Sequence, residues 1–380
     1  MEQPNFTAGV LIQQYQYHSF SPSKVNRPYK WIDSKIDILL EEANRHVGEL
    51  NTYSQLVPDV DFFIKMHILK EATTSSRIEG TKTSVEEAVL SKDEIDPERR
   101  DDWTEVQNYT RAMNHAIASL KKLPLSMRLL NETHKILLSG ARGKHKTPGE
   151  LRKSQNWIGG SSPRDATFVP PHHSELNTLL SDLEHYWHNE PLSIPHLIRI
   201  AVSHYQFETI HPYQGGNGRL GRLLITLYLI DKKILNRPTL YLSAFFEKNR
   251  SAYYDSLMRV RTANDLENWI KFFLVGTGET AQNSIATFQK IIKLKHSCEE
   301  SLVEMGKRAK TGAALLKLLY SKPIVNSKWV AEKLDLSSPA TNSLLACFVE
   351  HKILHEITGY RRNRLFAFSK YIRLFSDTSP

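Results

Sequence analysis

The sequence predicts a mainly α-helical protein with one small β-hairpin and, at its C-terminal end, a helix-turn-helix followed by a β-hairpin wing. Three observations predict this fold class. Apolar residues recur every three or four positions in most of residues 33–295, which is the spacing of amphipathic helices. The β-favouring run Thr167-Phe168-Val169 follows paired glycines. Short helical segments and a turn at Gly359 then close the chain.

Length and composition limit the number of domains, the kinds of partner and the cellular location that we expect. A chain of 380 residues allows two or three domains, and its net charge of +9 favours an acidic partner such as a nucleotide or a nucleic acid. Cys298 and Cys347 lack the spacing of metal ligands and are typical of buried thiols in a reducing compartment. We expect no signal peptide, because residues 1–30 lack a basic segment followed by an apolar one. No apolar run approaches the ~20 residues of a membrane span, so we expect no membrane contact and a cytoplasmic location.

The N-terminal region is expected to be an arm followed by helices. Residues 1–30 are polar and contain prolines, which predicts an extended arm packed on the surface. A helix follows the arm, and a second helix is expected over about 59–80. Pro58 and Asp59 supply its start signal, and Gly80 supplies a glycine stop.

The middle of the chain predicts a helical core with one irregular segment. Residues 155–171 contain paired glycines, a Ser-Ser-Pro turn and the β-favouring run, which together predict a hairpin flap. A long amphipathic helix over 264–295 is expected to close the core. Nearby histidines lack a carboxylate or cysteine that would complete a metal site, so we expect no metal ligands among His172, His173, His185 and His188.

The last part of the chain changes character. Residues 296–310 are charged and predict a linker or a linking helix, and 311–380 predict a winged helix-turn-helix domain. Ser337, Ser338 and Pro339 give one of its helices a cap and a first-turn proline. Such a domain binds DNA or contacts proteins, and basic residues favour phosphate contact. The basic residues are Lys352, Arg361, Arg362, Arg364 and Lys370.

Residues 211–222, HPYQGGNGRLGR, carry the strongest functional pattern. His211 comes first, and Gly215, Gly216 and Gly218 then leave backbone N–H groups uncovered. The segment that follows has helical apolar spacing, so the glycine loop opens a helix. Free N–H groups and the positive end of the helix dipole converge there and favour an anion such as phosphate.

The side chains of this stretch add to that pattern. Arg219 and Arg222 lie one helical turn apart and can reach the same opening, and guanidinium groups suit phosphate oxygens. Asn217 lies among the glycines. An imidazole at the edge of such a site, that of His211, can accept a proton near neutral pH. The spacing is neither that of the Walker loop nor that of the dinucleotide fingerprint.

The stretch closely resembles the motif H-P-F-x-(D/E)-G-N-G-R-x-x-R of the Fic (Fic/Doc) family, with Tyr213 in place of Phe. The resemblance implies a Fic-type helical core, residues 111–295, behind an N-terminal region, residues 1–110. It implies a nucleotidyltransferase that moves AMP from ATP to a protein hydroxyl. The matching residues are His211, Pro212, Gly216, Asn217, Gly218, Arg219 and Arg222.

The position of the family's Mg²⁺-binding acid is taken by Gly215, so no protein ligand for the metal is expected. Mg²⁺ would then be held by the ATP phosphates, Asn217 and water at lower affinity. On this basis we expect weak transfer with a high Mg²⁺ demand, improved by Gly215→Asp. A slow protein or another nucleotide chemistry is the alternative.

The resemblance also implies roles for single residues. His211 is the base that takes the proton of a Ser, Thr or Tyr hydroxyl on a target protein, for which the chain itself is one candidate. Tyr254, with Tyr253 nearby, lines the adenine pocket, and the flap residues Thr167, Phe168 and Val169 hold the target peptide by strand addition. The implied ATP contacts are Glu79, His211, Gly216, Asn217, Gly218, Arg219, Leu220, Gly221, Arg222, Tyr253 and Tyr254.

An inhibitory element is implied by the sequence S-x-x-x-E-G at the end of the second helix, formed by Ser75, Glu79 and Gly80. Glu79 would pair with Arg222 and deny that guanidinium to the γ-phosphate of ATP. A hundredfold preference for this inhibited state needs only about 2.8 kcal/mol, which is the order of one buried charge-assisted pair.

Two other functions remain open from the sequence. One is a DNA-binding regulator that uses the winged helix and retains a weakly active or silent Fic core as a nucleotide sensor. The other is a de-AMPylating enzyme in which Glu79 positions water. We also expect a homodimer, because closed two-fold symmetry is the commonest assembly of such proteins.

Overall fold

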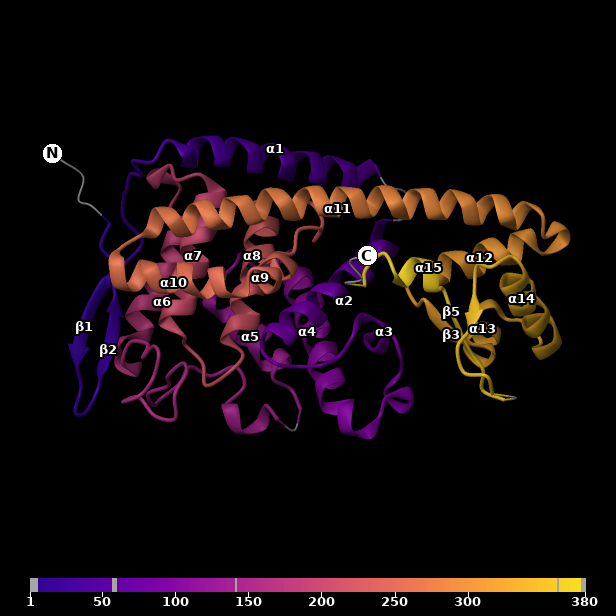
Figure 1. The fold of residues 1–380 in the computed structure, drawn as a ribbon, viewed down its shortest axis with the longest axis horizontal. Helices are drawn as coiled ribbons and strands as arrows, with labels where there is room; N and C mark the ends of the chain where they lie inside the picture. Colours follow the sequence, from indigo (N-terminus) through magenta and orange to yellow (C-terminus); the bar gives the residue numbers. More distant parts are fainter. Residues whose placement is uncertain (1–5, 57–59, 141, 361, 377–380) are drawn as a thin grey trace.

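The computed structural model describes residues 6–56, 60–140, 142–360 and 362–376, and these are mainly helical, as predicted. A helical body and a smaller C-terminal module are joined by the single long helix α11 (Leu266–Val303), as Figure 1 shows. Within the described ranges, no helix combines the length and the apolarity that crossing a bilayer requires.

The body surrounds two buried helices, α7 and α8. Nearly every side chain of these two helices is buried, because their apolar residues continue around the helix instead of forming one stripe. α1 lies along α11 across the top of the body in Figure 1. The helices of the body are α1 (Lys35–Leu56), α2 (Val60–Ile78), α3 (Val85–Ala88), α4 (Arg100–Ser119), α5 (Met127–Leu137), α6 (Leu176–His188), α7 (His196–Ile210), α8 (Asn217–Asp231), α9 (Ser243–Lys248) and α10 (Arg250–Ala263).

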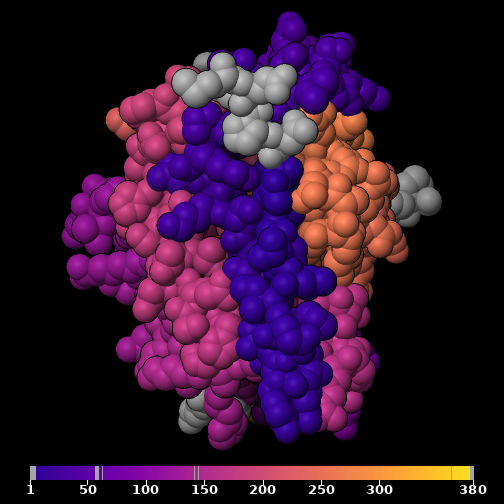
Figure 2. Space-filling model, turned by 90° about the vertical axis from the view of Figure 1, so that its left-hand side faces the viewer, coloured from indigo at the N-terminus to yellow at the C-terminus, as the bar shows by residue number. Residues whose placement is uncertain are grey.

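The N-terminal arm differs from the predicted extended segment. It forms an antiparallel hairpin of β1 (Gly9–Gln13) and β2 (His18–Pro22). The N–H of Phe20 in β2 also donates to the carbonyl of Val169, 2.9 Å away. The arm therefore pairs with the flap segment, a long-range contact that the polar composition did not reveal. Figure 2 shows the N-terminal segment as an indigo band along the side of the molecule that lies to the left in Figure 1.

The second predicted helix is α2. Its expected start signal, Pro58 and Asp59, lies outside the described residues. At the other end the helix stops at Ile78, and Gly80 has a φ of +104°. A glycine accepts that backbone conformation without steric cost, which is the stop that the sequence predicted.

The flap is less regular than the predicted hairpin. A single antiparallel bridge pairs Ile158 with Phe168 through two backbone hydrogen bonds of 2.8 and 3.1 Å. Between them Gly159 and Gly160 have φ near +70°. The carboxylate of Asp165 accepts hydrogen bonds from the backbone of this turn, so polar contacts replace a strand ladder.

Residues 296–303 are part of α11 rather than an irregular linker. Cys298 and Leu302 are buried one turn apart on the helix, and Lys295 lies 3.7 Å from Glu299. Buried i,i+4 apolar residues and i,i+4 charge pairs both stabilise helix, so this part of the segment is the linking helix that the sequence had left open beside a linker.

The C-terminal module combines short helices with an antiparallel sheet of order β3-β5-β4. The side chain of Ser337 caps α14, as the sequence predicted, and Gly359 turns the chain between β4 and β5. Arg361 lies outside the described residues. The elements are α12 (Ala309–Leu319), β3 (Ile324–Asn326), α13 (Ser327–Leu334), α14 (Ser338–Glu350), β4 (His355–Glu356), β5 (Leu365–Ala367) and α15 (Ser369–Ile372).

This module packs directly on the first half of α2. The ring of Phe63 lies 5.0 Å from that of Tyr320 and 6.4 Å from that of Tyr371, and the His67 ring lies 5.0 Å from Phe375. The helix that carries Ser75 and Glu79 at its far end is thus held at its near end by the C-terminal module.

Candidate active site

His211 follows directly after the last residue of α7. Its φ of +49° is left-handed, and its N–H donates to the carbonyl of Phe207, 3.0 Å away. The carbonyl of His211 accepts hydrogen bonds from Arg152 Nε at 3.0 Å and from Asn156 Nδ2 at 3.1 Å. The chain leaves α7 here in a turn, and these two side chains hold the backbone of that turn in place.

Arg152 and Asn156 are supporting residues that the sequence did not single out. The Arg152 guanidinium is buried and also donates to the carbonyls of Pro171 and Ile210. Asn156 also donates to the carbonyl of Tyr213 at 3.0 Å. Because backbone carbonyls are the acceptors, no pairing of charges along the sequence could have indicated these contacts.

His134 on α5 anchors the glycine loop. Its Nδ1 accepts the N–H of Gly149, so its Nε2 carries the proton and donates to the carbonyl of Gly215, 2.9 Å away. The ring stacks on Tyr213 at 3.8 Å. Burial lowers the pKa of His134 to about 4, which keeps the ring neutral and able to make both bonds.

The glycine loop opens α8. Gly216 stands before the first residue of the helix with a φ of +78°. The buried Asn217 accepts the Tyr213 N–H at 2.9 Å and donates to the Tyr213 carbonyl at 2.8 Å. Its amide therefore closes the loop, and the structure does not direct it into the opening where the sequence placed a phosphate contact.

Two further predicted ATP contacts face the interior. Leu220 is buried in the core. Gly221 packs against Glu208 and Phe207 of α7, where an added Cβ would overlap the Glu208 carboxylate. The carbonyl of Gly221 lies 2.9 Å from His204 Nδ1. Gly221 therefore belongs to the interface between α7 and α8, and Leu220 to the core.

Arg222 and Glu79 lie together beside the start of α8. The Arg222 guanidinium donates from Nη2 to Glu79 Oε1 at 2.7 Å, and from Nε and Nη2 to the hydroxyl and carbonyl of Ser75 at 2.9 and 2.8 Å. Arg222 is 2% exposed in its side chain, whereas Glu79 is 37% exposed. An added Cβ at Gly218 would overlap the Glu79 carboxylate, which therefore covers the first turn of the helix.

The charge state of Glu79 follows from these contacts. Burial disfavours its charged form, but attraction to Arg222, with a smaller contribution from Arg219, outweighs burial and lowers its pKa. The carboxylate is therefore ionised and anchored in the place where the first turn of α8 exposes its N–H groups.

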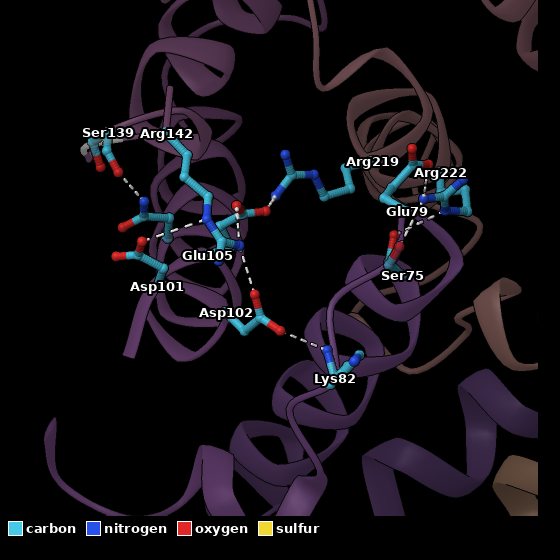
Figure 3. A network of polar contacts seen from close by, with 11 residues as sticks. Ser75, Glu79, Lys82, Asp101, Asp102, Glu105, Ser139, Arg142, Arg219 and Arg222 are labelled. Carbon is cyan, nitrogen blue, oxygen red and sulfur yellow. Dashed lines mark hydrogen bonds and ion pairs between the residues drawn. The ribbon is translucent and has the colours of Figure 1, made fainter. Parts of the chain in front are cut away.

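Arg219 points to a different partner. Its Nη1 lies 2.9 Å from Glu105 Oε2 on α4, and Glu105 Oε1 lies 3.4 Å from Nη1 of Arg142. Figure 3 shows the two motif arginines with different partners, Arg219 with Glu105, and Arg222 with Glu79 and Ser75. No sequence pattern indicates Glu105 as a partner of Arg219, because it lies more than a hundred residues from the motif on an ordinary amphipathic helix.

A cavity of about 230 Å³ adjoins this end of α8. Its wall includes Glu79, Glu105, Lys146, Gly216 and Arg219. The opening that the sequence predicted from free N–H groups and arginines thus exists as a space. Of its three wall carboxylates, Glu79 and Glu105 are held by motif arginines, and Asp101 lies 3.4 Å from Arg142.

The position of Gly215 does not fit a protein-held divalent ion. An added Cβ there would lie 2.6 Å from Cδ and 3.1 Å from Nζ of Lys146, so an ammonium group stands where a carboxylate ligand would extend. Asn217, the remaining predicted ligand, is engaged with Tyr213. Among the described residues, no group of three or more His, Cys, Asp and Glu side chains is placed to hold a metal ion.

His211 has the properties of a base. Its Nδ1 lies 3.4 Å from the carbonyl of Glu208, which can only accept, so Nδ1 carries the proton and Nε2 offers a lone pair. Burial lowers the pKa of His211 to about 4, although the charge of Glu79 acts in the opposite direction. The ring is therefore neutral at pH 7.

The two predicted adenine-pocket tyrosines have different surroundings. Tyr253 is buried, with its hydroxyl 2.8 Å from His204 Nε2 and its ring 4.4 Å from Phe246. Tyr254 is 44% exposed, with its ring 5.0 Å from Tyr253. Only Tyr254 presents an open aromatic surface, and Tyr253 supports it from the core.

The three flap residues are also unequal. Thr167 is exposed, whereas Phe168 and Val169 are buried. The Arg261 guanidinium lies 3.9 Å from the centre of the Phe168 ring. Since the Val169 carbonyl already accepts the N–H of Phe20, part of the flap edge is paired within the chain.

The histidines of the α6 region do not converge. His172 and His173 have their rings 4.0 Å apart, whereas His185 and His188 lie 2.6 and 2.7 Å from the carbonyls of Ser181 and Leu125.

Comparison with known proteins identifies the two matching regions. Residues 38–118 match the Fic/DOC family N-terminal region, and residues 124–229 match the Fic/DOC family. Relatives named protein adenylyltransferase Fic are 27% identical over 191 residues in Drosophila virilis and 28% identical over 212 residues in Culex quinquefasciatus. These alignments cover 49% and 53% of this chain but 36% and 39% of the relatives, so the chain spans well under half of their length.

Solved structures share the fold. A Fic family protein from Desulfovibrio desulfuricans G20 aligns with a TM-score of 0.57 at 18% identity, over 90% of this chain and 98% of its own. Fic-1 from C. elegans aligns with a TM-score of 0.51 at 20% identity, over 67% of this chain and 73% of its own. Through residues 38–118 and 124–229, the chain belongs to the Fic/DOC family.

Proposed function

We propose that this protein is a protein adenylyltransferase that moves AMP from ATP to a Ser, Thr or Tyr hydroxyl of a target protein, and that Glu79 inhibits it. One observation carries the proposal. Beside the neutral imidazole of His211, the start of α8 presents its N–H groups and a buried guanidinium, Arg222, that is covered by the partly exposed carboxylate of Glu79. The relatives named protein adenylyltransferase support the same chemistry.

The triphosphate is bound by this chain's own groups. The N–H groups of Gly216 and Gly218 lie at the positive end of α8 and suit phosphate oxygens. Arg219 and Arg222 can add bidentate contacts once their carboxylate partners withdraw. Tyr254 offers an open ring to the adenine.

The transfer step begins at the target hydroxyl. Nε2 of His211 takes the proton of the target hydroxyl, and the hydroxyl oxygen attacks the α-phosphorus. A new bond joins that oxygen to the α-phosphorus, and the bond from the α-phosphorus to the bridging oxygen breaks. Pyrophosphate leaves with the electron pair. Positioning and charge stabilisation supply most of the acceleration in such transfers.

Inhibition follows from competition for Arg222. While Glu79 Oε1 holds its Nη2 at 2.7 Å, the γ-phosphate cannot take that guanidinium, and the carboxylate stands over Gly218 where phosphate oxygens would bind. ATP can enter, but its triphosphate lies in a non-productive pose.

Self-labelling with ATP that carries the label in its α-phosphate tests this proposal. Label is expected in Glu79→Gly, at least tenfold above wild type, and its disappearance in Glu79→Gly/His211→Ala identifies the base. Glu41→Gly is the control for the chemical change, because it also replaces a glutamate by glycine, at an exposed position of α1 away from the glycine loop. Equal labelling of Glu79→Gly and Glu41→Gly would refute the inhibitory role.

The reverse reaction is a second candidate, favoured by the partial exposure of the ionised Glu79 carboxylate beside the α8 opening. That carboxylate could position water against an AMP-modified side chain. In this case Glu79→Gly loses removal of AMP from a modified protein and gains transfer, whereas simple inhibition changes transfer alone.

DNA binding through the C-terminal module is a third candidate, and the exposed Arg362 between β4 and β5 favours it. Arg364 is partly engaged, with Nη1 3.8 Å from Glu356. A shift of duplex DNA that weakens steeply with salt and with Arg362→Ala would support this function. Retention of the shift in the variant at every salt concentration would exclude this surface.

A further inference from the structure

Lys146 ends a short turn that follows α5, and its side chain lies against the glycine loop. The position of an added Cβ on Gly215 is 3.1 Å from Lys146 Nζ. Lys146 also belongs to the wall of the 230 Å³ cavity, together with Gly216 and Arg219. An ammonium group is therefore placed at the opening where the triphosphate of ATP would bind.

The placement is fixed by His134. That single imidazole accepts the N–H of Gly149, three residues after Lys146, and donates to the carbonyl of Gly215. It therefore ties the lysine-bearing loop to the glycine loop. The Lys146 N–H also donates to the carbonyl of Gly143 at 3.0 Å, which holds the backbone of the turn. The lysine is thus positioned by backbone contacts, and its ammonium group remains available.

The charges around the cavity are unequal. Glu79, Asp101 and Glu105 line it, but each is paired with an arginine. Within the described ranges, the Lys146 ammonium has neither an ion pair nor a hydrogen bond to the protein, and the Nε of the buried Arg219 also lacks a hydrogen-bond partner. A buried unpartnered donor such as Arg219 Nε is costly unless a ligand or water satisfies it, and Arg219 and the exposed Lys146 both line this cavity.

We propose that Lys146 binds the triphosphate directly and supplies the positive charge that a protein-held divalent ion would otherwise bring. This inference rests on the proposed function. Nucleotide binding by this protein then does not require Mg²⁺. A lysine ammonium is a compact charge with three donors and is well suited to phosphate oxygens.

The absence of a side chain at residue 215 fits the same proposal. A carboxylate at this position would stand within ion-pair distance of Lys146 and neutralise it. Because Gly215 has no side chain, it leaves room for the side chain of Lys146. Gly215→Asp alone is expected to weaken ATP binding in the absence of metal.

Calorimetric titration of ATP into the Glu79→Gly protein, in EDTA and in excess Mg²⁺, tests the proposal. The protein is expected to bind ATP with the same affinity in both. Lys146→Met is expected to lose roughly 10- to 100-fold in EDTA, the effect of one charge-assisted phosphate contact. Lys122→Met, which removes an equal charge from an exposed turn after α4, is expected to change nothing.

Adenosine serves as the probe that separates phosphate contact from folding, because it lacks phosphates. Equal adenosine binding by Lys146→Met and Lys122→Met, with a loss for ATP only in the former, is the expected result. If the Glu79→Gly protein binds ATP only with Mg²⁺, or if the two lysine variants bind ATP equally, the role of Lys146 is wrong and the proposed function stands. If ATP binds under neither condition, both are wrong.

Discussion

Glu105 on α4 lies with its Oε2 2.9 Å from Nη1 of Arg219, so a carboxylate occupies the first motif arginine just as Glu79 occupies the second. The two carboxylates come from different segments, Glu105 from α4 and Glu79 from the turn directly after α2. The removal of Glu79 therefore frees only one of the two guanidinium groups that the phosphates need, and Glu105 acts as an independent competitor for the other.

Glu105→Gln is accordingly expected to strengthen ATP binding further on the Glu79→Gly background. A partly exposed pair of this kind contributes about 1 kcal/mol, or roughly fivefold in the dissociation constant. Titration with ATP measures the change. Asp101→Asn is the control, because Asp101 lies 3.4 Å from Arg142 in the same network without touching Arg219. An equal gain in both variants would point to net charge instead of to the freed arginine.

The contact of the C-terminal module with α2 predicts a second route to activation. Phe63→Ala removes a buried ring that packs on Tyr320 and Tyr371, at a cost of about 3–5 kcal/mol for such truncations. A loosened α2 holds Glu79 less firmly over Gly218, so self-labelling per folded molecule is expected to rise.

Phe273→Ala in α11 is the matched truncation for this experiment, since Phe273 is as deeply buried and its ring packs on Trp269 of the same helix. Labelling is compared after the folded fraction of each variant has been measured by thermal unfolding. Equal labelling in the two variants would show that the module does not act through α2.

The pKa of His211 predicts the pH dependence of transfer. Below its pKa of about 4 the ring is protonated and cannot accept a proton, whereas above it the base is available. Single-turnover labelling by Glu79→Gly is therefore expected to be constant between about pH 6 and 8 and to fall only toward pH 4. The removal of Glu79, whose charge raises this pKa, shifts the fall lower. A midpoint near 6.5 would contradict the buried setting of the ring.

Glu71 predicts a pH dependence of stability with the opposite sign to that of ordinary carboxylates. Burial raises its pKa to about 7, although Ser243 and Tyr109 both donate hydrogen bonds to its Oε1. The folded state therefore binds this proton more tightly than the unfolded state. The contribution of protonated Glu71 to the free energy of unfolding is complete below about pH 4.5 and is lost as the pH rises through about 7.

Chemical unfolding of wild type and Glu71→Gln measures that contribution. The free energy of unfolding of wild type is expected to fall by about 3 kcal/mol relative to Glu71→Gln between pH 4.5 and 7. The comparison cancels the buried histidines, which are present in both proteins. A constant difference across this range would show that Glu71 titrates near its ordinary pKa.

The sequence by itself determined the features that local patterns encode. Apolar periodicity located the helices, the glycine at residue 80 ended α2, and the loop at residues 215–218 opened α8 as predicted. The family resemblance, carried by short contiguous motifs, was likewise confirmed by the comparisons. These features depend on neighbours within about a turn of one another, which a sequence shows directly.

Only the tertiary structure decided which side chains meet across the chain. The pairs Glu105–Arg219, Lys146–Gly215 and Phe20–Val169 join distant segments, and nothing in their spacing indicates contact. The physical reason is that a helix pattern fixes which face is buried but not which neighbouring element covers it. Long-range polar contacts, which set the charge around this site, therefore appear only once the helices have packed.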